Sequence, residues 1–310
     1  MSSMFHHRYL WIVLLFIFLP LTTMAQPTFT QQHFKKQIPA GNYSGICPLG
    51  DDLFAVVDDK APTDGFHVMR LVVDSLSQRI TEAEYMGYRS SGLPNRDMEG
   101  ICYHPSTRTV FISGEADNEV FEYTLDGQRT GRRLQMPDFI KQAESNYGLE
   151  SLTYDSCRHL FFTATEHVLP GESQVRLLAF GDDLTLQRQY LYQPDAPLSP
   201  KHLYGISALC ALADGRLLVM ERQVRIPRLK IGASALTRIY EVTPANDEQL
   251  EKTLLIEFKT RITLFGRKFA NFEGLCQVSP SLILLIADSQ DRYKGVLRDW
   301  FRLERVSPSM

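Results

Sequence analysis

The chain has 310 residues, of which 44% are hydrophobic and 22% are charged, and its formal net charge is −3. This balance, with no basic run or stripe, argues against a nucleic-acid partner. The length is large for one compact domain unless the chain forms a barrel, a propeller or another repeat.

The first 25 residues are predicted to be a signal peptide. A positive-leaning start precedes a short apolar stretch over residues 9–21, and Thr23 and Ala25 supply the small residues of a cleavage site. The alternative is an uncleaved membrane anchor, but the stretch is short and no stop-transfer charges follow it. We therefore expect an exported protein, periplasmic or secreted, with residues 26–310 as one domain and no membrane contact after cleavage.

Five copies of one motif follow along the chain. Each copy opens with Ser or Glu, continues with a small residue and an aliphatic one, and ends about 15 residues later in a carboxylate. The openers are Ser44, Glu99, Glu150, Ser207 and Glu273, and the closing acids are Asp58, Glu115, Glu166, Glu221 and Asp288. Recurrence at intervals of roughly 50 to 65 residues is typical of propellers and related repeat folds.

Each copy predicts three or four short antiparallel strands separated by turns rich in Gly, Asp and Pro. Apolar strands that follow the opener are predicted at 53–57, 109–113, 160–165, 217–220 and 282–287. Amphipathic third strands are predicted at 66–73, 119–124, 175–180, 237–242 and 300–306, and fourth strands at 80–88, 128–134, 184–191 and 253–258. The one stretch that could be helical is 138–145.

This pattern predicts an all-β fold, a closed β-propeller of five blades, with six blades as the alternative. The last copy is about one strand short of a blade, and the run Phe34–Ile38 near the N-terminus resembles a strand. We therefore expect the N-terminal strand to complete the last blade, because this removes an exposed sheet edge.

Four of the five cysteines share one position of the repeat, directly after the aliphatic residue. They are Cys47, Cys102, Cys210 and Cys276. Equivalent inner positions of neighbouring blades are too far apart for a disulfide, so these four are predicted to be buried core residues. Cys157 lies in a turn and is the one expected to be accessible.

Matching repeat positions of a propeller form rings around its central channel, so the openers and the closing acids should meet at one mouth. Eight carboxylates crowded there would repel one another unless a cation or basic side chains neutralise them. Ca²⁺ is the natural candidate, because it accepts six to eight oxygen ligands with flexible geometry. The predicted ligands are Glu99, Glu150, Glu273, Asp58, Glu115, Glu166, Glu221 and Asp288. The alternative is that these acids cap strand ends and accept hydrogen bonds between blades.

Basic residues lie beside the acids in the sequence: Lys60, Arg96, Arg222 and Arg292. Arginine can make forked contacts to phosphate or carboxylate groups, which favours a ligand-binding role near the channel. Ordinary surface salt bridges are the alternative. The basic cluster of Arg222, Arg225, Arg228 and Lys230 is predicted to lie in a loop with a solvated face.

The repeat motifs resemble the bacterial "esterase-like activity of phytase" family, also called phytase-like domain proteins. The likeness lies in segments such as Asp97-Met98-Glu99-Gly100-Ile101, and it recurs around every opener and closing acid. It covers nearly the whole chain after residue 25 and keeps the order of the motifs. The resemblance implies an exported β-propeller with phosphoester or ester hydrolase activity.

Our leading hypothesis is a metal-dependent hydrolase acting on a small anionic ester, as a monomer. Ca²⁺ would polarise the substrate, Glu99 or Glu273 would accept a proton from water, and Arg222 or Arg292 would stabilise the developing charge. A lactonase using the same cation would be a close variant. A non-catalytic propeller that binds a ligand or envelope partner at this face is the alternative. The sequence contains no Gly-x-Ser-x-Gly elbow, His-Glu-x-x-His, Cys-x-x-Cys or P-loop motif.

Overall fold

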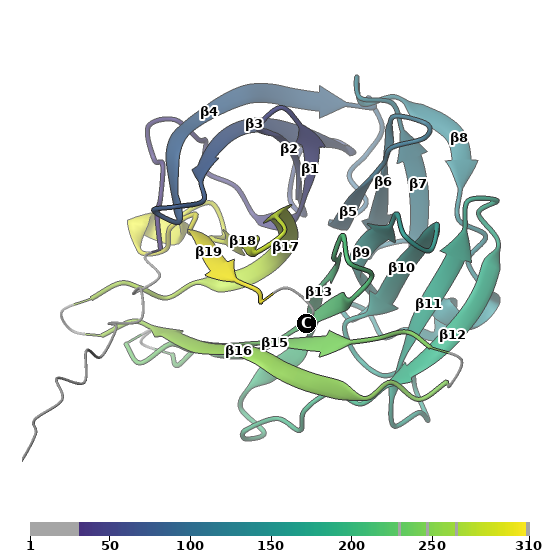
Figure 1. The fold of residues 1–310 in the computed structure, drawn as a ribbon. Coiled ribbons are helices and arrows are strands. Elements are labelled where there is room, and N and C mark those ends of the chain that lie inside the picture. The colour runs from purple at the N-terminus through teal and green to yellow at the C-terminus, as the bar shows by residue number, and fades with distance from the viewer. Residues whose placement is uncertain (1–30, 229–230, 246–247, 264–265, 308–310) are drawn as a thin grey trace, which may run out of the picture.

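The computed structural model describes residues 31–228, 231–245, 248–263 and 266–307, so the predicted signal peptide lies outside the described residues. Five β-sheets are arranged around a common centre (Figure 1), four of them with four strands and one with three. The fold is therefore a five-bladed β-propeller, and the alternative of six blades is not supported. Among the described residues no helix is long and apolar enough to cross a membrane.

The strands follow one another outward from the centre within each blade. Blade 1 contains β1 (Tyr43–Gly50), β2 (Leu53–Asp58), β3 (Gly65–Asp74) and β4 (Arg79–Ser90), and blade 2 contains β5 (Met98–His104), β6 (Thr109–Gly114), β7 (Glu119–Tyr123) and β8 (Arg129–Arg133). Blade 3 contains β9 (Leu149–Asp155), β10 (Leu160–Thr165), β11 (Val175–Gly181) and β12 (Leu186–Tyr192). Blade 4 contains β13 (Leu203–Ala211), β14 (Leu217–Arg225), β15 (Ser234–Val242) and β16 (Lys252–Arg261), and blade 5 contains β17 (Asn271–Ser279), β18 (Leu282–Asp288) and β19 (Phe301–Arg305).

The predicted strands and the one possible helix agree with the structure except at three places. The run Phe34–Ile38 is a turn, closed by the amides of Gln37 and Ile38 on the carbonyl of Phe34, so its prediction as a strand was wrong. Instead, Gln32 makes a single antiparallel bridge to Phe301 of β19. The possible helix at 138–145 is a short 3-10 turn, η1 (Asp138–Gln142).

The third difference is the length of β14, which was expected to end at Met220 and continues to Arg225. Its partners lengthen with it, since Leu203 of β13 pairs with Val224 and Ser234 of β15 pairs with Arg225. Arg222 and Arg225, which were predicted to lie in a loop, are therefore part of the strand.

The inner strand of every blade contains a β-bulge at the opener of the repeat. In β1, Tyr43 and Gly45 pair with consecutive residues of β2, and Ser44 between them is left out of the register. The same register shift leaves out Glu99 with Gly100, Glu150, Ser207 and Glu273 in the other four blades. A bulge changes the direction of the side chain it carries and occurs often beside functional sites.

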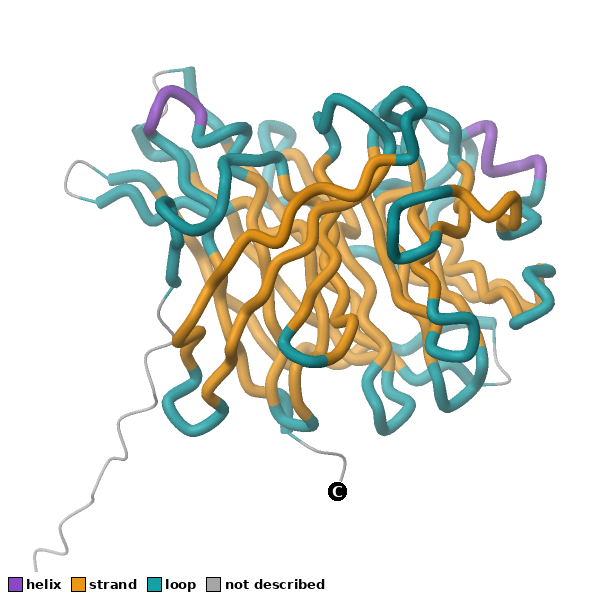
Figure 2. Tube along the Cα trace, turned by 90° about the horizontal axis from the view of Figure 1, so that it is seen from above, coloured by secondary structure: helices purple, strands orange, loops and turns teal. Residues whose placement is uncertain are grey.

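The inner strands also pack very closely against one another, since β1, β5, β9, β13 and β17 contact their neighbours in order and β17 contacts β1. A Cβ atom on Gly100 would lie 2.5 Å from the amide nitrogen of Leu152 in the next blade. Glycine is needed here because the neighbouring backbone occupies the space of a side chain. Seen from the side, the strands run through the middle of the molecule and loops cover its two ends (Figure 2).

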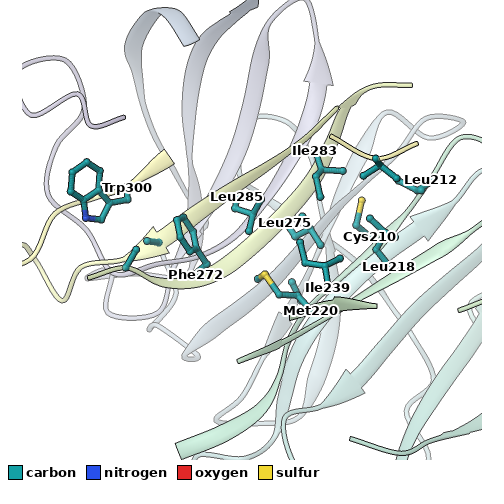
Figure 3. Close-up of a cluster of buried hydrophobic side chains, with 14 residues drawn as sticks. Cys210, Leu212, Leu218, Met220, Ile239, Phe272, Leu275, Ile283, Leu285 and Trp300 are labelled. Carbon is teal, nitrogen blue, oxygen red and sulfur yellow. The ribbon is translucent and has the colours of Figure 1, made fainter. Parts of the chain in front are cut away.

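Apolar clusters fill the spaces between neighbouring blades. Figure 3 shows the cluster between blades 4 and 5, where Met220 and Ile239 face Phe272, Leu275 and other side chains of blade 5. The prediction for the cysteines is confirmed. Four are buried and unpaired in the inner strands, and Cys157 is exposed.

The close approach of the inner strands generates a stability prediction. Gly100→Ala should lower the melting temperature by about 5 °C or more, because the new methyl group must displace the backbone of Leu152. Ser151→Ala is the matched control at the same repeat position of the next blade, where a side chain already fits. The Ser151 hydroxyl is buried with no hydrogen-bond partner, so its loss should leave the melting temperature unchanged within about 1 °C. Equal melting curves for Gly100→Ala and the native protein, measured by circular dichroism, would contradict the prediction.

Candidate functional site

An acidic cavity of about 360 Å³ lies at the end of the channel where the inner strands begin. Six of the eight predicted acids line it: the openers Glu99, Glu150 and Glu273 and the closing acids Glu115, Glu166 and Asp288. The bulges account for the openers, because each glutamate is the residue left out of the register. At the equivalent positions of blades 1 and 4, the hydroxyls of Ser44 and Ser207 donate to backbone carbonyls instead.

Arg222 lies at the centre of this cavity and joins three blades. Its Nη2 atom lies 3.0 Å from Oε1 of Glu150 and 3.0 Å from Oε1 of Glu166, and its Nη1 atom contacts Oε1 of Glu273. Glu273 also accepts a hydrogen bond of 2.6 Å from the amide of Asn271. Arg222 is therefore held inside the cavity by ion pairs, whereas Arg225 and Arg228 are exposed. The prediction that Arg222 lies on a solvated face was wrong.

Two closing acids, Glu221 and Asp58, lie outside the cavity lining and contact other partners. Glu221 accepts hydrogen bonds from the Tyr192 hydroxyl at 2.6 Å, the Lys252 ammonium at 2.6 Å and the amide of Asp195 at 2.9 Å. Its side chain lies on the opposite face of β14 from Arg222, as the alternation of a strand requires.

Asp58 is likewise directed into blade 1. It accepts a hydrogen bond of 3.0 Å from the amide of Lys60 and lies 3.6 Å from Nε2 of His67. These contacts match the blade-bracing role that the sequence left open for the acids. They do not bring Asp58 or Glu221 to the predicted metal site.

Two of the basic residues beside the acids are also directed away from the cavity. The guanidinium of Arg292 contacts Asp299 and donates to the carbonyl of Ile38 at 2.7 Å. Arg96 forms a forked pair with Asp117 at 2.7 and 2.9 Å. The structure therefore does not place Arg292 with the predicted catalytic residues.

Sequence reasoning missed two further acids at this site. Single carboxylate oxygens of Asp59, Asp97 and Glu99 lie within 4.8 Å of one another. The Lys60 ammonium bridges two of them, at 3.0 Å from Asp59 and 2.5 Å from Asp97. The signal in the sequence is the position of Asp59 after a closing acid and of Asp97 two residues before an opener.

Glu99 is the most isolated carboxylate of the group. It is 7% exposed and lines the cavity, and among the described residues no hydrogen-bond donor or ion-pair partner contacts its side chain. Burial raises the pKa of Glu99 well above its usual value, and the nearby Glu150 raises it further. A buried carboxylate without a donor is costly unless a proton or a cation neutralises it.

Three further acids of the cavity, Asp59, Asp288 and Glu150, show the same effect. Burial raises the pKa of Asp59 to about 7 in spite of Lys60 beside it, and it raises the pKa of Asp288 to about 6. Burial, and then the charge of Glu166, raises the pKa of Glu150 well above its usual value. Among the residues that the structure describes, seven carboxylates and two cationic side chains, Lys60 and Arg222, line the cavity. The site therefore has more carboxyl groups than cationic groups to pair with them.

The channel narrows directly behind the acids. Its aliphatic lining comes from the third residue of each repeat, Ile46, Ile101, Leu152, Leu209 and Leu275, which also line a second cavity of about 230 Å³ at the other end. The space between the two cavities is about 10 Å³, which holds no more than about one water molecule. A ligand of the acidic cavity must therefore enter and leave from its own mouth.

Comparisons with known proteins agree with this fold. A family model described as "Phytase-like: Esterase-like activity of phytase" matches residues 38–289. The catalytic domain of a Coprinopsis cinerea GH62 α-L-arabinofuranosidase is similar in structure, with 12% identity and a TM-score of 0.50, over 90% of this chain and 96% of that chain. The PQQ-bound aldose sugar dehydrogenase of Streptomyces coelicolor is similar with 10% identity and a TM-score of 0.46, over 91% and 99%. Identities this low concern the fold alone, and no curated protein sequence matches the chain.

The raised pKa values generate a prediction for stability. In buffer with EDTA, the melting temperature should fall as the pH rises from about 5 to 8, by about 5 °C. Between the ordinary pKa of 3.8 and the raised values of about 7 for Asp59 and about 6 for Asp288, the folded protein retains protons that the unfolded chain has lost. Stability from this source is complete at low pH and is lost as the pH rises through that range.

Asp59→Asn provides the control for this measurement. An amide cannot ionise, so the variant should show a shallower fall of melting temperature across the same pH range. A melting temperature that rises between pH 5 and pH 8 in the native protein would show that these acids are compensated in a way the structure does not contain.

Proposed function

We propose that this protein is an exported propeller hydrolase of phosphate or carboxylate esters, and that it works with Ca²⁺ at the acidic cavity. The chain belongs to the phytase-like family, whose model carries the description "esterase-like activity of phytase". The observation that carries this proposal is the excess of carboxylates around Glu99, a buried acid with no donor among the described residues. The export rests on the sequence of the first 25 residues, and we propose a periplasmic or secreted monomer.

The residues present fit a calcium ion. Asp59, Asp97 and Glu99 offer oxygen atoms within 4.8 Å of one another, and one oxygen of Asp59 is buried without a hydrogen-bond partner. Carboxylate oxygens are the ligands that this hard cation prefers. Lys60 now lies between two of these acids, but its side chain is 60% exposed and can move into solvent. When bound, Ca²⁺ would supply a Lewis acid for an ester oxygen.

The remaining residues have roles that follow from their contacts. Glu273 is held by Arg222 and Asn271, so its carboxylate has a fixed orientation at the cavity, and we assign it as the acceptor of the proton from the attacking water. Arg222, already ordered by Glu150 and Glu166, lies beside it and is positioned to stabilise negative charge that develops on the substrate. The narrow channel behind the acids limits access of bulk water to the open side.

The metal part of the proposal is tested by thermal unfolding. CaCl₂ at millimolar concentration should raise the melting temperature at pH 7.5 relative to EDTA, because a ligand bound only by the folded state stabilises it. Glu99→Gln should remove most of this rise, since an uncharged amide no longer attracts the cation. Glu84→Gln changes an exposed acid on β4 and should keep the full rise. A calcium-induced rise that survives in Glu99→Gln would place the ion elsewhere.

The catalytic part is tested by a screen of phosphate and carboxylate monoesters in the presence of CaCl₂. Glu273→Gln should lower kcat for any ester that is turned over by about 100-fold or more, because it removes the proton acceptor. The folded content should be unchanged, and Glu84→Gln should keep native activity. If Ca²⁺ binds and no ester in the screen is hydrolysed, the cavity belongs to a non-catalytic binding propeller and the enzymatic proposal is wrong.

A further inference from the structure

We propose that the acidic cavity has an apolar subsite on blade 4, formed by Leu203, Val224 and Ile226, which receives an aliphatic or aromatic group of the ester. The inference rests on the proposed function, because it assigns the class of substrate for the same cavity. The substrate is then an ester with one anionic group and one apolar group, in contrast to a polyol that carries many phosphates.

The first argument is the direction of the side chains on β14. Successive residues of a strand point to opposite faces, so Val224 lies on the same face as Arg222. Leu203 of β13 pairs directly with Val224, as Gly205 pairs with Arg222. Leu203, Val224 and Ile226 all line the cavity. Val224 and Leu203 therefore continue the row that begins at Arg222, about 7 Å farther along the strand, and Ile226 follows directly after β14 ends.

The second argument is the exposure of these side chains. Leu203 is 62% exposed and Ile226 is 44% exposed, although most aliphatic side chains of this size in the described residues are buried. Two further exposed aliphatic residues, Leu198 and Ile231, lie in the loops that adjoin the same ends of β13 and β14. Exposed apolar residues that gather at a cavity mouth are typical of a ligand-binding surface.

The third argument is that the wall has firm support. Val224 belongs to a small cluster of buried residues that also contains Ala235, Ile262 and Phe269. Tyr147 lines the cavity too, and its ring stacks on His167 at 4.0 Å between ring centroids. His167 in turn stacks on Tyr204, the neighbour of Leu203, at 4.7 Å. Val224 and the backbone beside Leu203 are therefore held in place before any ligand binds, which lowers the entropic cost of binding.

The charges of the cavity restrict the other end of the ligand. Lys60 and Arg222 are the two cationic side chains of the lining, and both are already paired with carboxylates. One anionic group can be accommodated beside a bound cation, whereas each additional phosphate would meet uncompensated carboxylates. The apolar wall offers such groups no hydrogen-bond donor.

The experiment compares the binding of methylphosphonate and hexylphosphonate, two probes that cannot be hydrolysed as esters, by calorimetry in CaCl₂. Hexylphosphonate should bind at least about tenfold more tightly, because its chain is removed from water on the aliphatic wall. In Leu203→Ser and Ile226→Ser, both at exposed positions that tolerate the change, the ratio of the two affinities should fall several-fold. Leu254→Ser is the matched control, since Leu254 is 47% exposed, lies on the outer strand β16 and does not line the cavity.

Equal affinities of the two phosphonates, a ratio that both Ser variants leave unchanged, or a failure of both probes to bind would each overturn the subsite. The result also separates the subsite from the proposed function. A preference for hexylphosphonate that Leu203→Ser reduces, in a protein that hydrolyses no ester, would support the subsite and contradict the hydrolase.

Discussion

The acidic cavity depends on a β-bulge that recurs at the opener of all five inner strands. Without the bulge, the opener would occupy an ordinary ladder position. With it, the openers of blades 2, 3 and 5 reach the cavity as glutamates. The backbone also makes room for a closing acid, since Gly205 of β13 lies directly against the side chain of Glu166 and a Cβ atom would overlap it. The packing of neighbouring blades thus leaves space for the crowded carboxylate side chains.

This arrangement is poorly explained by stability alone. Arg222 contacts three carboxylates, but removing charges from water costs about as much as such contacts return. Glu99 has no partner among the described residues, and the pKa values of Asp59 and Asp288 are raised by burial. The acids that brace blades look different, because Glu221 has three donors. Acids with complete partners are structural, whereas a cluster that lacks them is expected where a ligand binds.

The blades could be predicted from the sequence because their strands are local, apolar and separated by turn residues. The openers could be predicted as well, since Ser in two copies shows that folding does not require an acid there. The role of each closing acid could not, because it depends on which face of a strand the residue occupies. The strand β14 continues past Arg222, where a loop was predicted. Glu221 and Arg222 are neighbours in this strand, so their side chains point to opposite faces.

Arg292 shows the same limit in a turn. It lies four residues after Asp288, but Gln290, Asp291 and Arg292 all have positive φ angles, and this left-handed path turns its side chain toward Asp299. Proximity along the chain therefore did not become proximity in space. Asp59 and Asp97 show the converse, because Asp59 follows β2 and Asp97 directly precedes β5, and they meet only when blades 1 and 2 pack against each other.

The strand β14 carries both Arg222 and Val224, so it restricts the orientation of a ligand that contacts both residues. Arg222 is fixed by acids of blades 3 and 5, while Val224 is fixed by the small cluster behind blade 4. The two ends of the binding surface are therefore parts of one rigid backbone segment, and their separation is set by the rise of a strand. A ligand whose anionic group lies near Arg222 must direct its apolar group over blade 4. Glu99, Asp59 and Asp97 belong to blades 1 and 2 and to the loop between them, so the proposed cation site and the proposed apolar subsite come from different sectors of the ring.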